Sequence, residues 1–186
     1  MYKRQGELGW ELHHPIEMQN YLLDKLLRSG KEFNLKLVGA RAQKWLRQEK
    51  SYKAFGSDLG RDAGPFESKL SRFVDINKNF LGKDALLKRK TDVSCVTLLI
   101  DGPKDIDPWG REALYNETEE VMLGRLTSAG YSVHFKRSIG IGYVKSSFSE
   151  VGTKLRIKID DAFWNAEIVR DSPYDPENEK IIDRAQ

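Results

Sequence analysis

The sequence predicts an α+β protein in which an incomplete α/β lobe is followed by a small antiparallel β-barrel. Before residue 91, apolar residues recur mainly at helical spacing, and glycine-rich loops separate them. After residue 91, short apolar or alternating segments follow one another, a pattern typical of strands. We therefore divide the chain into a lobe over residues 1–91, a barrel domain over residues 92–172 and a tail over residues 173–186.

Three helices are predicted in the lobe. Apolar residues at helical spacing place the first over residues 17–28, and Ser29-Gly30 predicts a left-handed stop behind it. The others are expected over residues 40–49 and 83–90. Short strands are expected at residues 8–12 and 73–76. We expect this part of the chain to be an incomplete α/β (ferredoxin-like) lobe.

The barrel domain is predicted to contain five strands: residues 93–100, 121–128, 139–144, 154–159 and 163–169. Gly140 and Gly142 share one face of the third strand, as expected where another backbone approaches closely. Asp160-Asp161 reads as the turn that joins the last two strands into a hairpin. These features favour a closed barrel over an open sheet.

Composition indicates an ordinary soluble protein, with 39% hydrophobic and 32% charged residues and no apolar run of about 18 residues that would suggest a membrane span. The 31 basic and 28 acidic residues are interspersed, so nucleic acid is not a favoured partner. An RNA-binding barrel would need basic and aromatic side chains clustered on one face. The polar start, Met1 to Glu7, does not resemble a secretory signal, and we expect a cytoplasmic protein.

No metal site or catalytic dyad is predicted from the residues alone. His13 and His14 are neighbours on an expected strand and would point to opposite faces, and no third ligand follows them. Cys95 lies in an apolar strand and reads as a core residue. Asp160 and Asp161 read as a turn before they read as an acid–base pair.

Short blocks along the chain carry a resemblance to a known family. They are Gly6 to Leu12, Gly39 to Arg41, Leu46 to Tyr52, Phe80 to Leu87, Gly124 to Ser128, Ile141 to Val144 and Pro173 to Pro176. In order and spacing they resemble the glycine cleavage T-protein (aminomethyltransferase) family, and more narrowly the folate domain of the dimethylglycine and sarcosine dehydrogenases. The resemblance implies tetrahydrofolate binding and one-carbon transfer from a glycine-type or N-methylated amine.

The resemblance also implies three cofactor-binding residues. Glu11 matches the family glutamate that binds the pterin, whose ring N–H and exocyclic amine can donate two parallel hydrogen bonds to a carboxylate. Arg41 matches an arginine that lines the same site. Its charge near a helix start calls for a ligand anion or a paired carboxylate. Tyr174 matches a C-terminal aromatic residue that reaches back toward the folate channel.

Departures from the family pattern leave two readings open. Gln48 stands where the family usually has leucine, and the upstream half that supplies an aspartate near the reacting nitrogen is not in this chain. We therefore assign no catalytic residue and expect activity only if a complementary chain supplies that lobe. The alternative is a non-catalytic module that dimerises. The folate reading requires Glu11 and Arg41 to line one pocket, and the alternative leaves them solvated or paired structurally.

Overall fold

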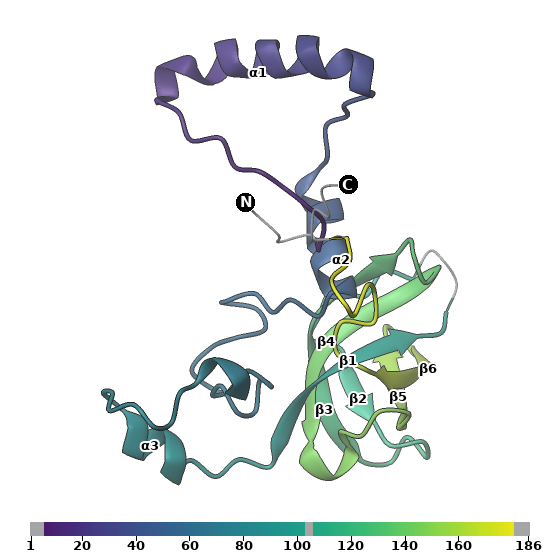
Figure 1. Ribbon diagram of the computed structural model, residues 1–186. Coiled ribbons are helices and arrows are strands. Elements are labelled where there is room, and N and C mark those ends of the chain that lie inside the picture. Colours follow the sequence, from purple (N-terminus) through teal and green to yellow (C-terminus); the bar gives the residue numbers. More distant parts are fainter. Residues whose placement is uncertain (1–5, 103–105, 181–186) are drawn as a thin grey trace.

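The second half of the chain forms a closed barrel of six antiparallel strands (Figure 1). The computed structural model describes residues 6–102 and 106–180. The strands are β1 (Val93–Ile100), β2 (Ala113–Tyr115), β3 (Met122–Ser132), β4 (Arg137–Lys145), β5 (Lys154–Ile159) and β6 (Ala162–Val169). Their order around the barrel is β1-β4-β3-β2-β5-β6, and β6 pairs with β1 to close it. The predicted hairpin and the predicted closure are confirmed.

The barrel interior is the main core of the described chain. In β5 the alternation is strict, and Leu155, Ile157 and Ile159 are buried. Each large aliphatic side chain that is removed from water in this way contributes about 1.5–3 kcal/mol. Cys95 is 1% exposed, and burial raises the pKa of its thiol to about 12. The cysteine is therefore a protonated core residue, as expected.

One of the two predicted close approaches is especially tight. A Cβ atom at Gly142 would lie 2.6 Å from the carbonyl oxygen of Arg125 on β3, so only glycine fits against the neighbouring backbone there. β2 was not predicted from the sequence; it has three residues and a register shift against β3. A strand this short carries too little alternation to be distinguished from a loop.

The first half of the chain is helical, which confirms the α+β class. It contains α1 (Gln19–Ser29), α2 (Ala40–Glu49) and α3 (Lys83–Lys88), with 3-10 turns at Ile16–Met18, Gly30–Phe33 and Ser71–Phe73 and a fourth, Ser146–Phe148, in the barrel. The bounds predicted for α2 are confirmed. Its Trp45 lies against β3 at Gly130, where a Cβ atom would meet the indole ring at 2.0 Å. α2 is thus anchored on the barrel.

Three local predictions for the lobe are wrong. Residues 8–12 and 73–76 form no strand, because neither segment has a sheet partner among the described residues and an isolated extended segment has no ladder to stabilise it. Gly30 is not left-handed, with φ of −77°. The chain continues through a 3-10 turn and reverses at Asn34, with φ of 55°, since asparagine tolerates the left-handed region.

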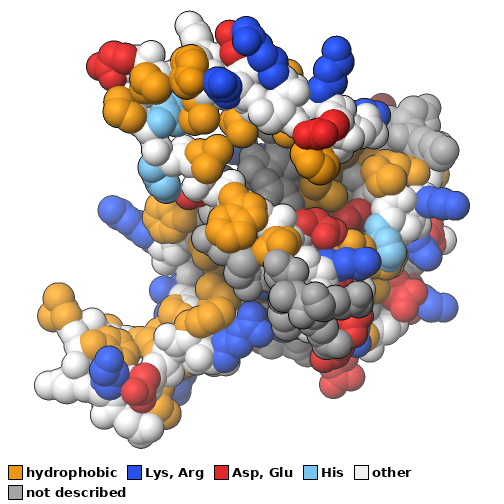
Figure 2. All heavy atoms as spheres, turned by 45° about the horizontal axis from the view of Figure 1, so that its top comes forward, with side chains coloured by type: hydrophobic (Ala, Val, Ile, Leu, Met, Phe, Trp, Pro, Cys, Tyr) orange, Lys and Arg blue, Asp and Glu red, His pale blue; other side chains and the backbone are white. Residues whose placement is uncertain are grey.

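α1 and its flanking segments, residues 10–38, form an arm that projects away from the barrel (Figure 1). No residue of α1 is buried, and hydrophobic side chains are visible along this arm in the space-filling view (Figure 2). None of the helices in the described residues has the length and apolarity needed to cross a membrane.

The tail docks against the end of α2. The Lys50 ammonium is fully buried and donates to the Asp175 carbonyl at 2.5 Å and to Asn178 Oδ1 at 2.9 Å. The first segment joins the same place, where the Leu8 amide donates to the Lys180 carbonyl at 3.2 Å. Residues 181–186, the end of the predicted tail, lie outside the described residues.

Candidate functional site

Arg41 is held between two tryptophans at the start of α2. Its guanidinium carbon lies 5.2 Å from the centre of the Trp45 ring and 5.4 Å from the centre of the Trp109 ring, and the group forms an ion pair with Asp107. Asp107 is the paired carboxylate that the position of Arg41 at a helix start predicts. These four residues line a cavity of about 270 Å³. A planar cation between aromatic faces can bind both a flat conjugated ring and an anion.

The Arg41 cavity is open to solvent on the side of Trp109, whose side chain is 71% exposed. Trp109 lies in a Pro-Trp-Gly segment, and the structure places its indole beside a charged group. The spacing of residues gives no local signal for this, because Trp109 and Arg41 are brought together only when α2 docks on the barrel.

Glu11 and Tyr174 lie outside the Arg41 cavity. Glu11 is half exposed, and its carboxylate lies 3.6 Å from His13 Nε2. The Tyr174 hydroxyl donates to Glu7 Oε1 at 2.6 Å, and its ring packs edge-on against His134. The bond to Glu7, together with burial, raises the pKa of Tyr174 to about 12. None of the described contacts joins the three predicted cofactor-binding residues, and their assignment stays a prediction.

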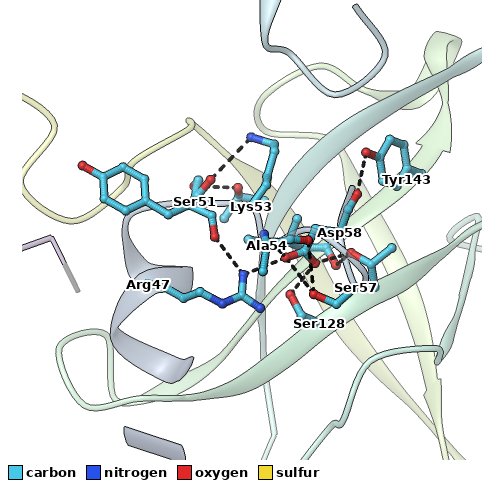
Figure 3. Close-up of polar contacts among 12 residues, drawn as sticks. Arg47, Ser51, Lys53, Ala54, Ser57, Asp58, Ser128 and Tyr143 are labelled. Carbon is cyan, nitrogen blue, oxygen red and sulfur yellow. Dashed lines mark hydrogen bonds and ion pairs between the residues drawn. The ribbon is translucent and has the colours of Figure 1, made fainter. Parts of the chain in front are cut away.

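A buried carboxylate that the sequence analysis did not single out organises the region beneath α2 (Figure 3). Asp58 is 2% exposed and accepts hydrogen bonds from Arg47 Nη1 at 2.7 Å and the Ala54 amide at 2.9 Å. The hydroxyls of Thr127 and Ser128 each donate to its other oxygen at 2.6 Å. These are neighbours on β3, and the register shift between Leu126 and Ser128 allows both to reach one carboxylate.

The protonation of Asp58 follows from these contacts. Burial alone would raise its pKa, but the charge of Arg47 and the hydrogen bonds from Ser128, Thr127 and Ala54 hold the pKa below the ordinary value. Asp58 is therefore ionised at neutral pH and its lone pairs are occupied. It serves as a structural anchor that ties the loop after α2 to the barrel, and it is poorly suited to act as a base.

The Asp58 anchor borders a second, larger cavity of about 750 Å³ on the outer face of β3 and β4. The Tyr143 hydroxyl lies 2.8 Å from the Asp58 carbonyl, to which it donates, and 2.7 Å from Ser68 Oγ. Burial raises the pKa of Tyr143 to about 12, so this phenol stays protonated. Within residues 6–102 and 106–180, no group of three or more histidine, cysteine, aspartate or glutamate side chains is arranged to hold a metal ion.

Comparison with known proteins places both halves of the chain in one family. Residues 5–78 match the GCVT N-terminal domain, and residues 94–175 match the glycine cleavage T-protein C-terminal barrel domain. Mitochondrial dimethylglycine dehydrogenase of Mus musculus is 34% identical over 173 residues, which cover 89% of this chain and 19% of that protein. Aminomethyltransferase of Caldanaerobacter subterraneus subsp. tengcongensis is 31% identical over 170 residues, which cover 91% of this chain and 45% of that protein.

A solved structure shows the same fold. The glycine cleavage system aminomethyltransferase T from Bartonella henselae superposes with a TM-score of 0.74 at 22% identity, covering 87% of this chain and 45% of that one. The chain thus spans less than half the length of the relatives that it matches. Because the two family domains match in sequence order and together span most of its residues, this chain belongs to the glycine cleavage T-protein family, as a partial member with its C-terminal barrel.

Proposed function

We propose that this chain binds tetrahydrofolate and takes part in one-carbon transfer from a glycine-type or N-methylated amine. The observation that carries the proposal is the placement of Arg41 between Trp45 and Trp109, at the position that resembles the arginine of the family folate site. The indole faces can stack on the conjugated rings of folate, and the guanidinium can pair with its carboxylates. Asp107 holds the guanidinium in place until a ligand arrives.

The size of the Arg41 cavity supports the further proposal that a second polypeptide completes the site. Its volume of about 270 Å³ falls just below the roughly 300–1,000 Å³ that is usual for sites of drug-sized ligands. Part of the folate would therefore lie against another surface. No catalytic residue is assigned to the chain. The carboxylate expected near the reacting nitrogen would come from the complementary lobe and stabilise developing positive charge there.

The α1 arm is the surface we propose for that complementary polypeptide. It exposes large apolar side chains that a soluble monomer rarely leaves together in water. They include Trp10 at 74%, Leu12 at 57%, Ile16 at 72% and Tyr21 at 57% exposure. Glu11 lies within this arm, so a polypeptide that covers it would also bring the proposed pterin contact into a buried environment.

The same arm favours a second candidate function, a non-catalytic module that dimerises. In that case the apolar arm of one chain packs against the same arm of a second copy. The ion pair of Arg41 with Asp107 and the exposed position of Glu11 are then the final arrangement of these groups.

Calorimetric titration of the purified chain with tetrahydrofolate under reducing conditions separates the two functions when its mass is measured on the same sample. The folate function predicts saturable binding. In the complex with the complementary polypeptide, it predicts that Glu11→Ala weakens this binding by about 1.5–3 kcal/mol, roughly ten- to more than a hundredfold. Glu17→Ala, which removes an exposed carboxylate from the same arm, serves as the control and should change nothing. A dimer that shows no binding up to about 1 mM tetrahydrofolate would support the dimerising module instead.

A further inference from the structure

We propose that the cavity on the outer face of β3 and β4 is a second binding site, for a small organic anion with an apolar body. Its volume of about 750 Å³ lies within the roughly 300–1,000 Å³ of small-molecule sites. It shares no lining residue with the Arg41 cavity. The site is therefore separate from the one proposed for tetrahydrofolate, and its occupation does not depend on that function.

The fold builds the floor and the roof of this cavity from fixed parts. Leu126 is fully buried in the barrel, so the preceding Arg125 and its cross-strand partner Tyr143 project from the outer face. The loop over residues 56–63 covers this face. Asp58 holds the loop through Thr127 and Ser128 on β3, and the Tyr143 hydroxyl donates to the Asp58 carbonyl at 2.8 Å. The cavity is thus preformed, and a ligand would not have to order its walls.

The charge of the lining favours an anion. Arg111 and Arg125 both line the cavity, and neither has an ion-pair partner in the described part of the chain. Asp58 is neutralised by Arg47, which leaves Asp62 as the one acidic residue opposing two cations. Guanidinium groups present paired donors that match the oxygens of a carboxylate or phosphate.

The backbone of Arg111, whose side chain is exposed, is held in an unusual conformation. Arg111 has φ of 105°, a conformation that side chains rarely adopt, and follows Gly110 with φ of 95°. The turn is fixed from both sides. The Arg111 amide donates to the Leu126 carbonyl at 2.9 Å, and the Glu112 carboxylate accepts from the Trp109 amide at 2.7 Å and the Gly110 amide at 2.9 Å. Glycine would fit this position without strain, so a change of Arg111 to glycine removes the guanidinium without disturbing the turn.

The remaining wall is apolar. Leu59, Ala63, Val93 and Met122 line it, and Met122 is 53% exposed although it lies on a sheet. A flexible methionine at an open surface adapts to ligands of different shape. The occupant that fits these walls is a molecule with one carboxylate or phosphate and an aromatic or short aliphatic body.

Titration with phenyl phosphate and with benzoate, followed by the backbone amide signals in two-dimensional NMR, tests the proposal on the full chain. We expect saturable shifts of residues 56–63 and of Tyr143, and no such shifts with neutral benzyl alcohol. Comparison of the two anions tells whether the site prefers phosphate or carboxylate. Tetrahydrofolate at saturation should leave these shifts in place, because the two cavities are separate.

Variants make the test specific. Arg111→Gly removes the guanidinium and suits the positive φ, so it should fold at least as stably as the parent chain and bind phenyl phosphate about tenfold more weakly. Arg125→Gln should weaken binding about equally, and Arg125→Lys should recover part of it. Arg137→Gln on β4, outside the cavity, is the matched control and should bind like the parent chain. Equal binding of benzyl alcohol, no saturable shift with either anion, or an equal loss in Arg137→Gln would overturn the proposal.

Discussion

Gln48 offers a test of the packing between α2 and the barrel. Its side chain is completely buried, and neither amide atom has a hydrogen-bond partner among the described residues. A buried polar group without a partner costs about 1–3 kcal/mol. Gln48→Leu removes that cost and introduces the residue that the family usually has, while the change of side-chain shape costs under about 1.5 kcal/mol. We therefore expect the free energy of unfolding to rise by about 1 kcal/mol.

Urea unfolding followed by tryptophan fluorescence measures this change, and a melting curve should shift upward by about 2–4 °C for each kcal/mol. Gln43→Leu on the same helix is the control, since Gln43 is only partly buried and should change stability by less than about 0.5 kcal/mol. Gln48→Glu should destabilise strongly, because it would bury a charge. If Gln48→Leu lowers the stability, the amide has a bound partner in solution and the assignment of an unsatisfied group is wrong.

Three further outcomes are expected. The native pKa of Asp58 lies below its ordinary value near 3.8, so the stability that its charge contributes is complete above about pH 5 and is lost as the pH falls through the native pKa. Asp58→Asn should therefore make the loss of stability at acid pH less steep, as followed by circular dichroism. An unchanged loss of stability at acid pH would contradict this. Lys50→Met leaves the Asp175 carboxylate buried without its cation, which should lower the free energy of unfolding by about 3–5 kcal/mol and expose the tail to limited proteolysis. A tail that stays resistant to the protease would argue against a stabilising role for the Lys50–Asp175 ion pair. Trp109→Ala should weaken tetrahydrofolate binding by about 0.5–2 kcal/mol in calorimetry with little effect on stability, and unchanged affinity would remove this indole from the site.

The fold could be predicted where local pattern and tertiary environment agree. β1 and α2 have the predicted bounds. The apolar run of β1 fills the barrel, and α2 packs the indole of Trp45 against the barrel, so the local pattern and the tertiary contacts favour the same structure. Residues 8–12 have the alternation of a strand and yet no strand forms, because a strand requires a partner that the described chain does not supply. The alternation of apolar residues indicates that a segment can form a strand. It does not indicate whether a partner strand is present.

The candidate sites were predictable only through resemblance. Arg41 was found because its block resembles a family motif, but its two tryptophan neighbours come from a helix and a loop far apart in the sequence. Asp58 was missed because nothing in the short segment around it distinguishes a buried anchor from a loop carboxylate. Arg111 has a positive φ, which residue type predicts well for glycine and poorly for arginine.

The docking of the tail gives the order in which this chain can complete its structure during synthesis. A ribosome releases residue 8 and the end of α2 long before the segment around Asp175 exists. Until then the Lys50 ammonium has no acceptors from Asp175 or Asn178, and the Leu8 amide has no carbonyl at Lys180. Leu8 and Lys50 therefore lack these hydrogen bonds while the barrel strands are synthesised and the barrel closes. Residues 175–180 thus hold Leu8 and the end of α2 in place, and a nascent chain arrested before residue 175 would have a closed barrel beside a helix that lacks these contacts.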